Sequence, residues 1–190
     1  MSPPLILHLD ACTDRFLTGG KAAGLARLIA EGFPVPPGIC LTVEAYRLFL
    51  REQGMDAEAL WSQVRDVEGA ARASVLEDCR KRIQQGHLSN DCAFEVMRHL
   101  DTLRRPADQC WAVRSSATNE DNTRASFAGL YHTALGVAGN QMATNIQTVW
   151  ASLWDERVVS YYERVGWSDR PPAMAVVVQP VLDARAAGVL

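Results

Sequence analysis

Arg114, Ser115 and Ser116 form a group of consecutive residues whose chemistry suits an anion. They follow the apolar run Cys110 to Val113, which predicts a buried strand, so we expect Arg114 where that strand meets its connection. A guanidinium presents several fixed N–H donors that match the oxygens of a phosphate. The two serines add hydroxyl groups next to it. This segment therefore indicates the binding of a phosphate or another anion.

The connection expected after this strand contains small residues. Ala128 and Gly129 would keep it slim enough for backbone N–H groups to approach a ligand, as in glycine-rich phosphate loops. A second explanation needs no ligand, because Arg114 could pair with Glu120 or Asp121 at the end of the strand. From this segment alone both explanations stand.

A lysine after two glycines supplies a second cation. Gly19 to Lys21 opens a predicted helix that Gly32 ends, so Lys21 would lie at the positive N-terminus of that helix. The N-terminal amides, the helix dipole and the ammonium group would together favour an anion. The sequence lacks the spacing Gly-x-x-x-x-Gly-Lys-Ser/Thr of the common phosphate loop. A solvated lysine after a turn is the alternative.

Apolar patterns along the chain predict the elements that would hold these residues. Strands are expected at 3–10, 110–113, 130–137 and 174–180, and helices at 20–31, 42–53, in three stretches of 57–105, and at 140–165. The last strand alternates too little for a half-exposed one and should be buried. The expected fold class is α+β, with a mixed sheet flanked by helices and a helical insert at 57–105. Aromatic residues of the last helix, such as Trp150 and Trp154, are interpreted as core.

Composition excludes several classes of protein. The chain has 190 residues, is 48% hydrophobic and carries a net charge of −3 with its basic residues dispersed, so it has no electrostatic footprint for nucleic acid or an acidic membrane. It has no apolar run of about 20 residues and no secretory signal, which predicts a cytoplasmic location. Its 5 cysteines are an odd number without a close pair, and we expect reduced, mostly buried thiols. The oligomeric state stays open.

The motifs also occur in an order that characterises one group of enzymes. They are Gly19 to Lys21, Pro34 to Gly38, Thr42 to Tyr46, Val113 to Ala117 with Glu120 and Asp121, Ser126 to Gly129, and Val176 to Pro180. In this order they resemble the N-terminal nucleotide-binding domain of phosphoenolpyruvate synthase, pyruvate phosphate dikinase and rifampicin phosphotransferase. The resemblance extends over residues 17–190, which is nearly the whole chain.

The resemblance implies a role for particular residues. Lys21 and Arg114 match residues that hold the ATP phosphates, and they are the expected catalytic residues. Gly129 and Thr133 match a loop and strand start that line the nucleotide pocket, and Gln179 matches a glutamine near the adenine. Without the resemblance, Thr133 would be interpreted as a strand threonine and Gln179 as a polar residue at an edge.

The resemblance also implies an ATP-grasp fold, in which the nucleotide lies between two lobes. The carboxylate and amide that hold Mg²⁺ belong to the second lobe of such enzymes, so no metal ligand is expected in this chain. Residues 1–190 would be the N-terminal part of the ATP-binding domain, because the apolar run 186–190 looks like an interrupted strand. The second lobe, the swivelling phosphohistidine domain and the substrate domain would lie outside it.

Three functions are compatible with this resemblance. In the first, the chain is the ATP-binding part of a phosphotransferase that passes phosphate from ATP through a histidine to pyruvate. In the second, the acceptor is a different small molecule, such as the antibiotic hydroxyl used by rifampicin phosphotransferases. In the third, it is a nucleotide-binding or partner-binding module without catalysis of its own.

Overall fold

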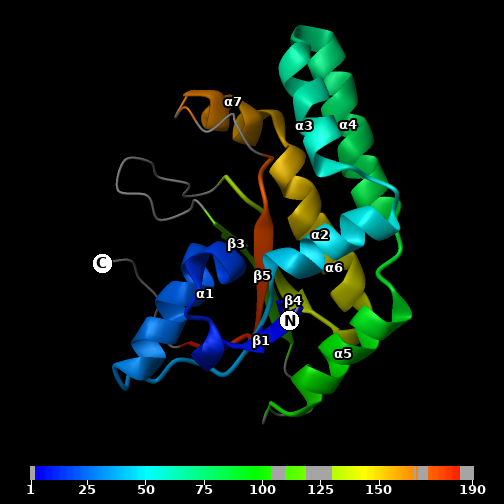
Figure 1. The fold of residues 1–190 in the computed structure, drawn as a ribbon. Coiled ribbons are helices and arrows are strands. Elements are labelled where there is room, and N and C mark those ends of the chain that lie inside the picture. The colour runs from blue at the N-terminus through cyan, green and yellow to red at the C-terminus, as the bar shows by residue number, and fades with distance from the viewer. Residues whose placement is uncertain (1–2, 104–109, 119–129, 165, 167–170, 185–190) are drawn as a thin grey trace.

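The computed structural model describes residues 3–103, 110–118, 130–164, 166 and 171–184. In this part of the chain the strands form a five-stranded sheet in the order β1-β2-β5-β3-β4 (Figure 1). The strands are β1 (Ile6–His8), β2 (Ile39–Leu41), β3 (Trp111–Ala117), β4 (Thr133–Val137) and β5 (Met174–Pro180). All pairings among them are antiparallel, so the prediction of a mixed sheet is wrong for the described residues. The α+β class is confirmed, with helices on both faces of the sheet.

Strand β5 lies at the centre of the sheet. Every residue of this strand is buried, as its unbroken apolar run predicts. Met174, Val176 and Val178 face one side and belong to the larger hydrophobic core, while Ala175 and Val177 face the other side and belong to a smaller one. The two faces of the sheet are therefore packed by different sets of helices.

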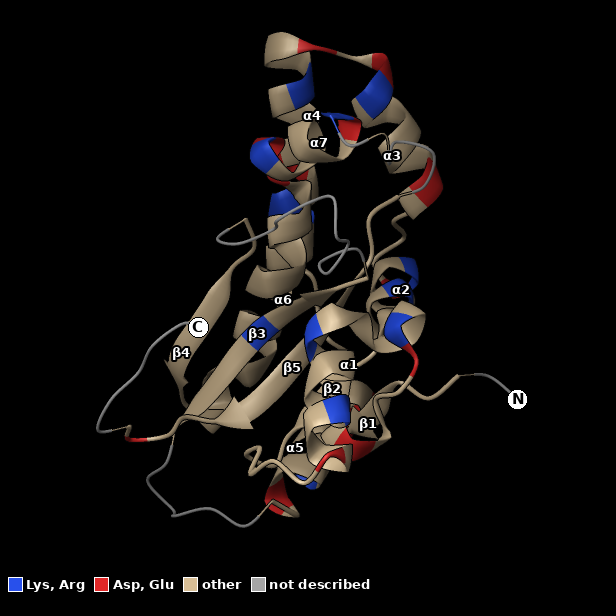
Figure 2. Cartoon of the chain, turned by 90° about the vertical axis from the view of Figure 1, so that its left-hand side faces the viewer, with Lys and Arg blue, Asp and Glu red and all other residues tan. Residues whose placement is uncertain are grey.

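Helix α1 (Arg15–Ala30) covers part of one face. It contacts β2, β5 and β3, and in Figure 2 it lies beside β5 while no labelled helix lies in front of β4. Its buried side chains are small, for example those of Ala22 and Ala26, which allows the helix to lie close to the sheet. The helix ends before Gly32, whose φ is 83°, as the sequence predicted.

The remaining helices pack on the opposite face and on one another. They are α2 (Val43–Glu52), α3 (Ala57–Asp66), α4 (Gly69–Gln85), α5 (Asn90–Asp101), α6 (Met142–Ala151) and α7 (Glu156–Arg164). In Figure 1, α3 and α4 stand away from the sheet at the top of the molecule. Trp150 and Trp154 are fully buried, and the Trp154 Nε1 donates to the Tyr46 hydroxyl at 3.0 Å. The aromatic residues are thus core, as predicted.

The single helix expected at 140–165 is two helices in the structure. Helix α6 ends at Ala151, a short 3₁₀ turn follows at Ser152–Trp154, and α7 begins at Glu156. Asp155 lies between them in an extended conformation, and its Oδ1 accepts from the backbone N–H of Arg157 at 3.0 Å. Asp155 thereby caps a new helix, which redirects the chain after Trp154.

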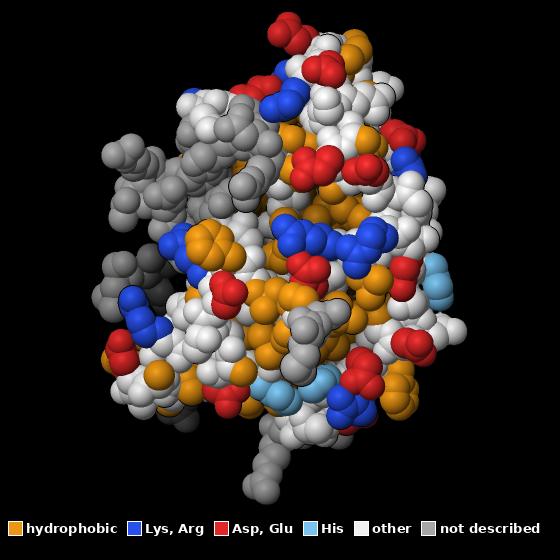
Figure 3. Space-filling model, in the orientation of Figure 1, with side chains coloured by type: hydrophobic (Ala, Val, Ile, Leu, Met, Phe, Trp, Pro, Cys, Tyr) orange, Lys and Arg blue, Asp and Glu red, His pale blue; other side chains and the backbone are white. Residues whose placement is uncertain are grey.

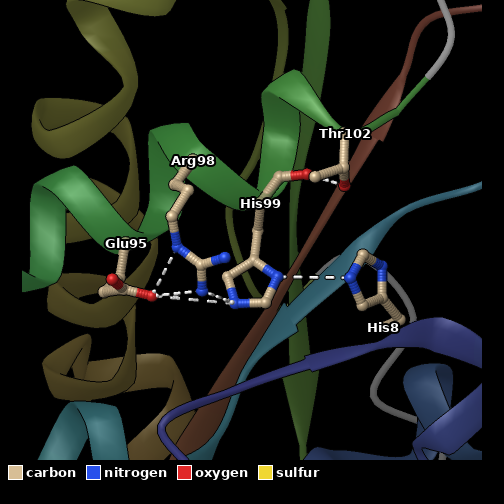
Figure 4. Close-up of polar contacts among 5 residues, drawn as sticks. All are labelled: His8, Glu95, Arg98, His99 and Thr102. Carbon is tan, nitrogen blue, oxygen red and sulfur yellow. Dashed lines mark hydrogen bonds and ion pairs between the residues drawn. The ribbon is translucent and has the colours of Figure 1, made fainter.

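Helix α5 is joined to β1 by a pair of histidines. Figure 4 shows the His99 Nδ1 facing the His8 Nε2, at 3.2 Å, with Arg98 and Glu95 on the other side of the His99 ring. The Arg98 Nη2 lies 3.1 Å from the His99 Nε2. Arginine only donates, so the His99 Nε2 accepts and the His99 Nδ1 carries the proton that it donates to His8.

The thiols and the surface follow the sequence predictions. All five cysteines are free, and only Cys110 is exposed. On the face in Figure 3, acidic and basic side chains are interspersed, with hydrophobic side chains gathered near the centre. Among the described residues no helix has the length and hydropathy to cross a membrane.

Candidate functional site

Arg114 lies inside β3 rather than at its end, which corrects the sequence prediction. The strand continues to Ala117, because Ser115, Ser116 and Ala117 pair with β5. Antiparallel pairing places Arg114 directly between Thr133 of β4 and Val177 of β5. Residues opposite one another share a face of the sheet, so Arg114 and Thr133 lie side by side on the face that carries α1.

This region of the sheet is open to solvent. Arg114 is half-buried, Thr133 is exposed, and Leu135 on the same face is 70% exposed. The guanidinium of Arg114 makes no ion pair with any residue that the structure describes. Glu120 and Asp121, its alternative partners in the sequence, lie outside the described residues. Within the described part of the chain, Arg114 therefore remains a candidate for binding an anionic ligand.

Lys21 begins the main part of helix α1. The helix contains a kink at Gly19, where φ is 75° and ψ is 171°, and it restarts from Gly20. Lys21 is therefore in the first turn of the second segment, which confirms the predicted helix start, although a short helical turn from Arg15 precedes it. The Lys21 Nζ donates to the Ser115 Oγ at 3.4 Å, which connects the lysine to the strand that carries Arg114.

Both serines after Arg114 are buried and hold protein groups, although the sequence suggested that they would face a ligand. The Ser116 Oγ accepts from the Ala22 N–H at 3.1 Å and donates to the Thr18 carbonyl at 2.7 Å. One of the amides at the start of the helix is thus bonded to Ser116 and is not open to an anion. Sequence reasoning missed this contact, because a serine in a strand and a serine in a phosphate loop have the same local pattern.

Gln179 lies on the α1 side of β5, opposite Ala112. It is 6% exposed, and its Nε2 donates to the Pro36 carbonyl at 2.9 Å. Gly38 lies directly against it, because a Cβ on Gly38 would come within 2.6 Å of the Gln179 Cγ. The proline-rich segment before β2 therefore orients this glutamine, which leaves part of its amide for other partners. On β5, Gln179 lies two residues after Val177, which is the residue that pairs with Arg114.

Gly129, the remaining predicted site residue, lies outside the described residues. The structure also contains a cavity of about 1400 Å³ beyond the C-terminal end of β3. Phe16, Arg47, Arg51 and Thr118 are among the residues that line it, but Lys21 and Arg114 are not. The two predicted anion-binding residues are thus not among the described residues that line this cavity.

Strand register places Arg114, Thr133 and Gln179 on the face of the sheet that carries α1. Lys21 comes from α1, which is distant from β3 in sequence, and its ammonium contacts Ser115, the residue after Arg114. Such a set of donors suits an extended anionic ligand with polar groups along its length. Within the described residues, no three His, Cys, Asp or Glu side chains form a group that could hold a metal ion.

Comparison with known proteins identifies a matching family and several relatives. A family model described as pyruvate phosphate dikinase, AMP/ATP-binding domain, matches residues 16–190. A phosphoenolpyruvate synthase from Aeropyrum pernix is 36% identical to this chain. The match covers 100% of this chain and 24% of the length of that enzyme.

Two other relatives carry different names at similar identity. A rifampicin phosphotransferase from Streptomyces sviceus is 38% identical over 92% of this chain and 20% of its own length. A prodigiosin synthesizing transferase, PigC, from Serratia marcescens is 35% identical over 100% of this chain and 20% of its own length. The chain therefore spans a quarter or less of the length of these three relatives.

Proposed function

Because the chain belongs to the family of the pyruvate phosphate dikinase AMP/ATP-binding domain, we propose that it forms the phosphate-binding side of an ATP site in a phosphotransferase. Lys21 and Arg114 hold the phosphates in this proposal. The observation that carries it is the position of Arg114, which is half-buried, pairs with the exposed Thr133 and makes no ion pair with a described residue. The Lys21 ammonium lies at the neighbouring Ser115.

The chemistry of these two cations fits a polyphosphate. The fixed fork of a guanidinium can contact two phosphate oxygens at once, while the ammonium acts as a compact point charge on a flexible stem. Neither residue serves as a base in this proposal. Their contribution to phosphoryl transfer is positioning and electrostatic stabilisation of the charge on the transferring group.

Thr133 and Gln179 extend the proposed site toward the nucleoside. Side chains of directly opposed residues in an antiparallel pair have Cβ atoms about 5 Å apart, and diagonal neighbours are about 7–8 Å apart. Thr133 and Gln179 therefore fall within reach of one nucleotide that is anchored at Arg114. Gly129 is proposed to line the same pocket on the strength of its motif alone.

Closure of the site by a second, ATP-grasp-like lobe belongs to the same proposal. Among the described residues no labelled helix lies in front of β4, and Leu135 of this strand is exposed, which is consistent with a partner lobe from a longer protein (Figure 2). Mg²⁺ would neutralise phosphate charge when bound, but the described residues do not fit a magnesium site. Its ligands are therefore proposed on the second lobe, and the phosphohistidine and substrate domains elsewhere in the longer protein.

We propose pyruvate as the acceptor, reached through a phosphohistidine, because several relatives are named phosphoenolpyruvate synthase. The rifampicin phosphotransferase supports an antibiotic hydroxyl as the alternative acceptor. Relatives with these different names match at 36% and 38% identity, so the portion they share with this chain does not select between them. Assays of the longer protein with pyruvate and with rifampicin separate the two.

Substitution of the two cations tests the proposal. Lys21→Ala and Arg114→Ala should each weaken ATP binding by about 1.5–3 kcal/mol, the scale of a hydrogen bond to a charged group, and leave adenosine binding unchanged. Arg114→Lys should recover only part of the loss, because it restores the charge without the fork. Lys81→Ala and Arg98→Ala are matched controls, since both side chains are exposed and pair with nearby glutamates. Equal losses for ATP and adenosine would remove the assignment to phosphate.

A further inference from the structure

Ser116 is placed to set the position of Lys21 relative to Arg114. It lies two residues after Arg114 on β3, on the same face of the sheet, at a distance of about 7 Å along the strand. Its side chain is fully buried against the start of helix α1. The strand that carries one proposed phosphate ligand thus also contacts the turn that carries the other.

Two hydrogen bonds and one close packing contact join this serine to the turn. The hydroxyl accepts from the Ala22 N–H at 3.1 Å and donates to the Thr18 carbonyl at 2.7 Å, so it bonds the chain on both sides of the Gly19 kink. Gly19 itself packs on the backbone of Ser116, because a Cβ on Gly19 would lie 1.9 Å from the Ser116 carbonyl oxygen. Lys21 lies between the residues that are held in this way.

A hydroxyl is the group that this arrangement requires. It donates one hydrogen bond and accepts another, and here it uses both functions on backbone groups that are themselves buried. An alanine would leave the Ala22 N–H without this partner and would release the turn from the strand. The turn could then move, and the lysine with it, while the rest of helix α1 stays packed on the sheet.

We infer that Ser116 is a positioning residue, which acts through Lys21 to hold its ammonium in register with the Arg114 guanidinium for the phosphates of one ligand. This inference rests on the proposed function. It assigns the second serine of the segment to the geometry of the site and not to direct contact with the ligand. Ser116 does not touch the nucleotide, so its loss affects only the part of the binding that depends on Lys21.

Nucleotide titrations of a Ser116→Ala variant test this role. The expected result is an ATP affinity about tenfold weaker than that of the unsubstituted chain, with adenosine affinity within twofold. Thr42→Val is the matched control, because Thr42 is also a fully buried residue whose hydroxyl holds two segments together, donating to the Pro4 carbonyl at 2.8 Å. It should leave the ratio of ATP to adenosine affinity unchanged.

Adenosine affinity serves as the control for folding in these titrations. A variant that is only partly folded would bind both ATP and adenosine more weakly. If the alanine variant does not fold, Ser116→Cys replaces it, because the thiol fills the space of the hydroxyl but is only a weak donor and a weak acceptor. An equal fall in ATP and adenosine affinity in the variant that folds would overturn the inference.

A double-substitution cycle shows whether Ser116 acts through the lysine. In a Lys21→Ala background, Ser116→Ala should change ATP affinity by less than twofold, because the group that it positions is already absent. A second tenfold loss in that background would overturn the inference.

Failure of the proposed function is a different result, namely no preference of the unsubstituted chain for ATP over adenosine. A preserved preference in Ser116→Ala would reject the positioning role alone.

Discussion

Arg114 is the residue on which the candidate site depends most. Charged side chains within a strand are usually turned to solvent or paired, and this one is half-buried with no ion pair to a described residue. Its neighbours across the sheet are an exposed threonine and a buried valine, Thr133 and Val177. An arginine in this setting keeps its N–H donors available without the cost of breaking an existing ion pair.

Residue types alone made Arg114 and Lys21 candidate anion ligands, but they left open an ion pair of Arg114 with Glu120 or Asp121 and a solvated Lys21. The same reasoning misjudged Ser115 and Ser116. Their hydroxyls resemble those of a phosphate loop in sequence, but pairing with β5 buries them, and pairing between distant segments is invisible in a local pattern.

At the residue scale, His99 predicts how the stability of the fold depends on pH. Burial, the nearby Arg98 charge and His8 lower the pKa of His99 from its usual value of 6.5. Below pH 6.5 the unfolded chain therefore binds more protons at this position than the folded chain, and acid favours unfolding. The free energy of unfolding, measured in urea, should fall between pH 7 and pH 5, with full stability from this group above pH 6.5.

Two histidine variants test whether His99 causes this pH dependence of the unfolding free energy. His99→Gln should flatten the fall in unfolding free energy between pH 7 and pH 5, because the group that resists protonation is gone. His132→Gln should keep it, since the His132 side chain is exposed and distant in sequence from the pair. An unchanged pH profile in His99→Gln would contradict the explanation.

At the scale of elements, helix α1 is defined by how closely it approaches the sheet. Its buried face carries Thr18, Gly19, Gly20, Ala22 and Ala26, and its larger apolar residues are at most half-buried. The helix start and end were predictable from the glycines at 19, 20 and 32. The kink at Gly19 was not, because it follows from the contact with Ser116 on a strand almost a hundred residues later.

Two glycines of this helix should respond in opposite ways to alanine. Gly19→Ala should destabilise the fold by about 3 kcal/mol or more, because φ is +75° and the new Cβ would strike the Ser116 carbonyl. Gly24→Ala should stabilise it by about 0.5–1 kcal/mol, since no atom lies within 4 Å of the added Cβ and alanine favours a helix. Thermal unfolding of both variants provides the measurement. Equal effects would show that the close approach of α1 to β3 is wrong.

The strands show the same division between local and distant information. The buried run of β5 and the helix after Thr42 were predicted from their patterns. Thr42 occupies the predicted N-cap position of α2, but its hydroxyl bonds the Pro4 carbonyl and not the helix. The break between α6 and α7 was missed, because the aromatic residues around Trp154 continue the helical spacing across it.

At the scale of the whole molecule, the chain is an antiparallel sheet with one face fully packed and the other only partly covered. Among the described residues, helix α1 contacts β2, β5 and β3, and no labelled helix lies in front of β4, whose Thr133 pairs with Arg114 (Figure 2). The order of motifs was enough to predict the family. The open half of the sheet could not be predicted, because it depends on strand order, which motifs do not specify.

Family membership is the basis of the function that we propose for this surface. This chain spans 24% or less of the length of the three relatives compared above, and these relatives carry different names. A part that is shared by such proteins at similar identity is expected to bind what they have in common. In our account this common ligand is ATP, with its phosphates at Lys21 and Arg114.

Calorimetric titration of this chain with ATP, ADP, AMP and adenosine tests that account most directly. If Lys21 and Arg114 hold the phosphates, affinity should rise with the number of phosphates, and the rise should be lost in the Lys21→Ala, Arg114→Ala double variant. Affinities that are equal for all four ligands, or a rise that survives in the double variant, would contradict the assignment of these two residues to an ATP site.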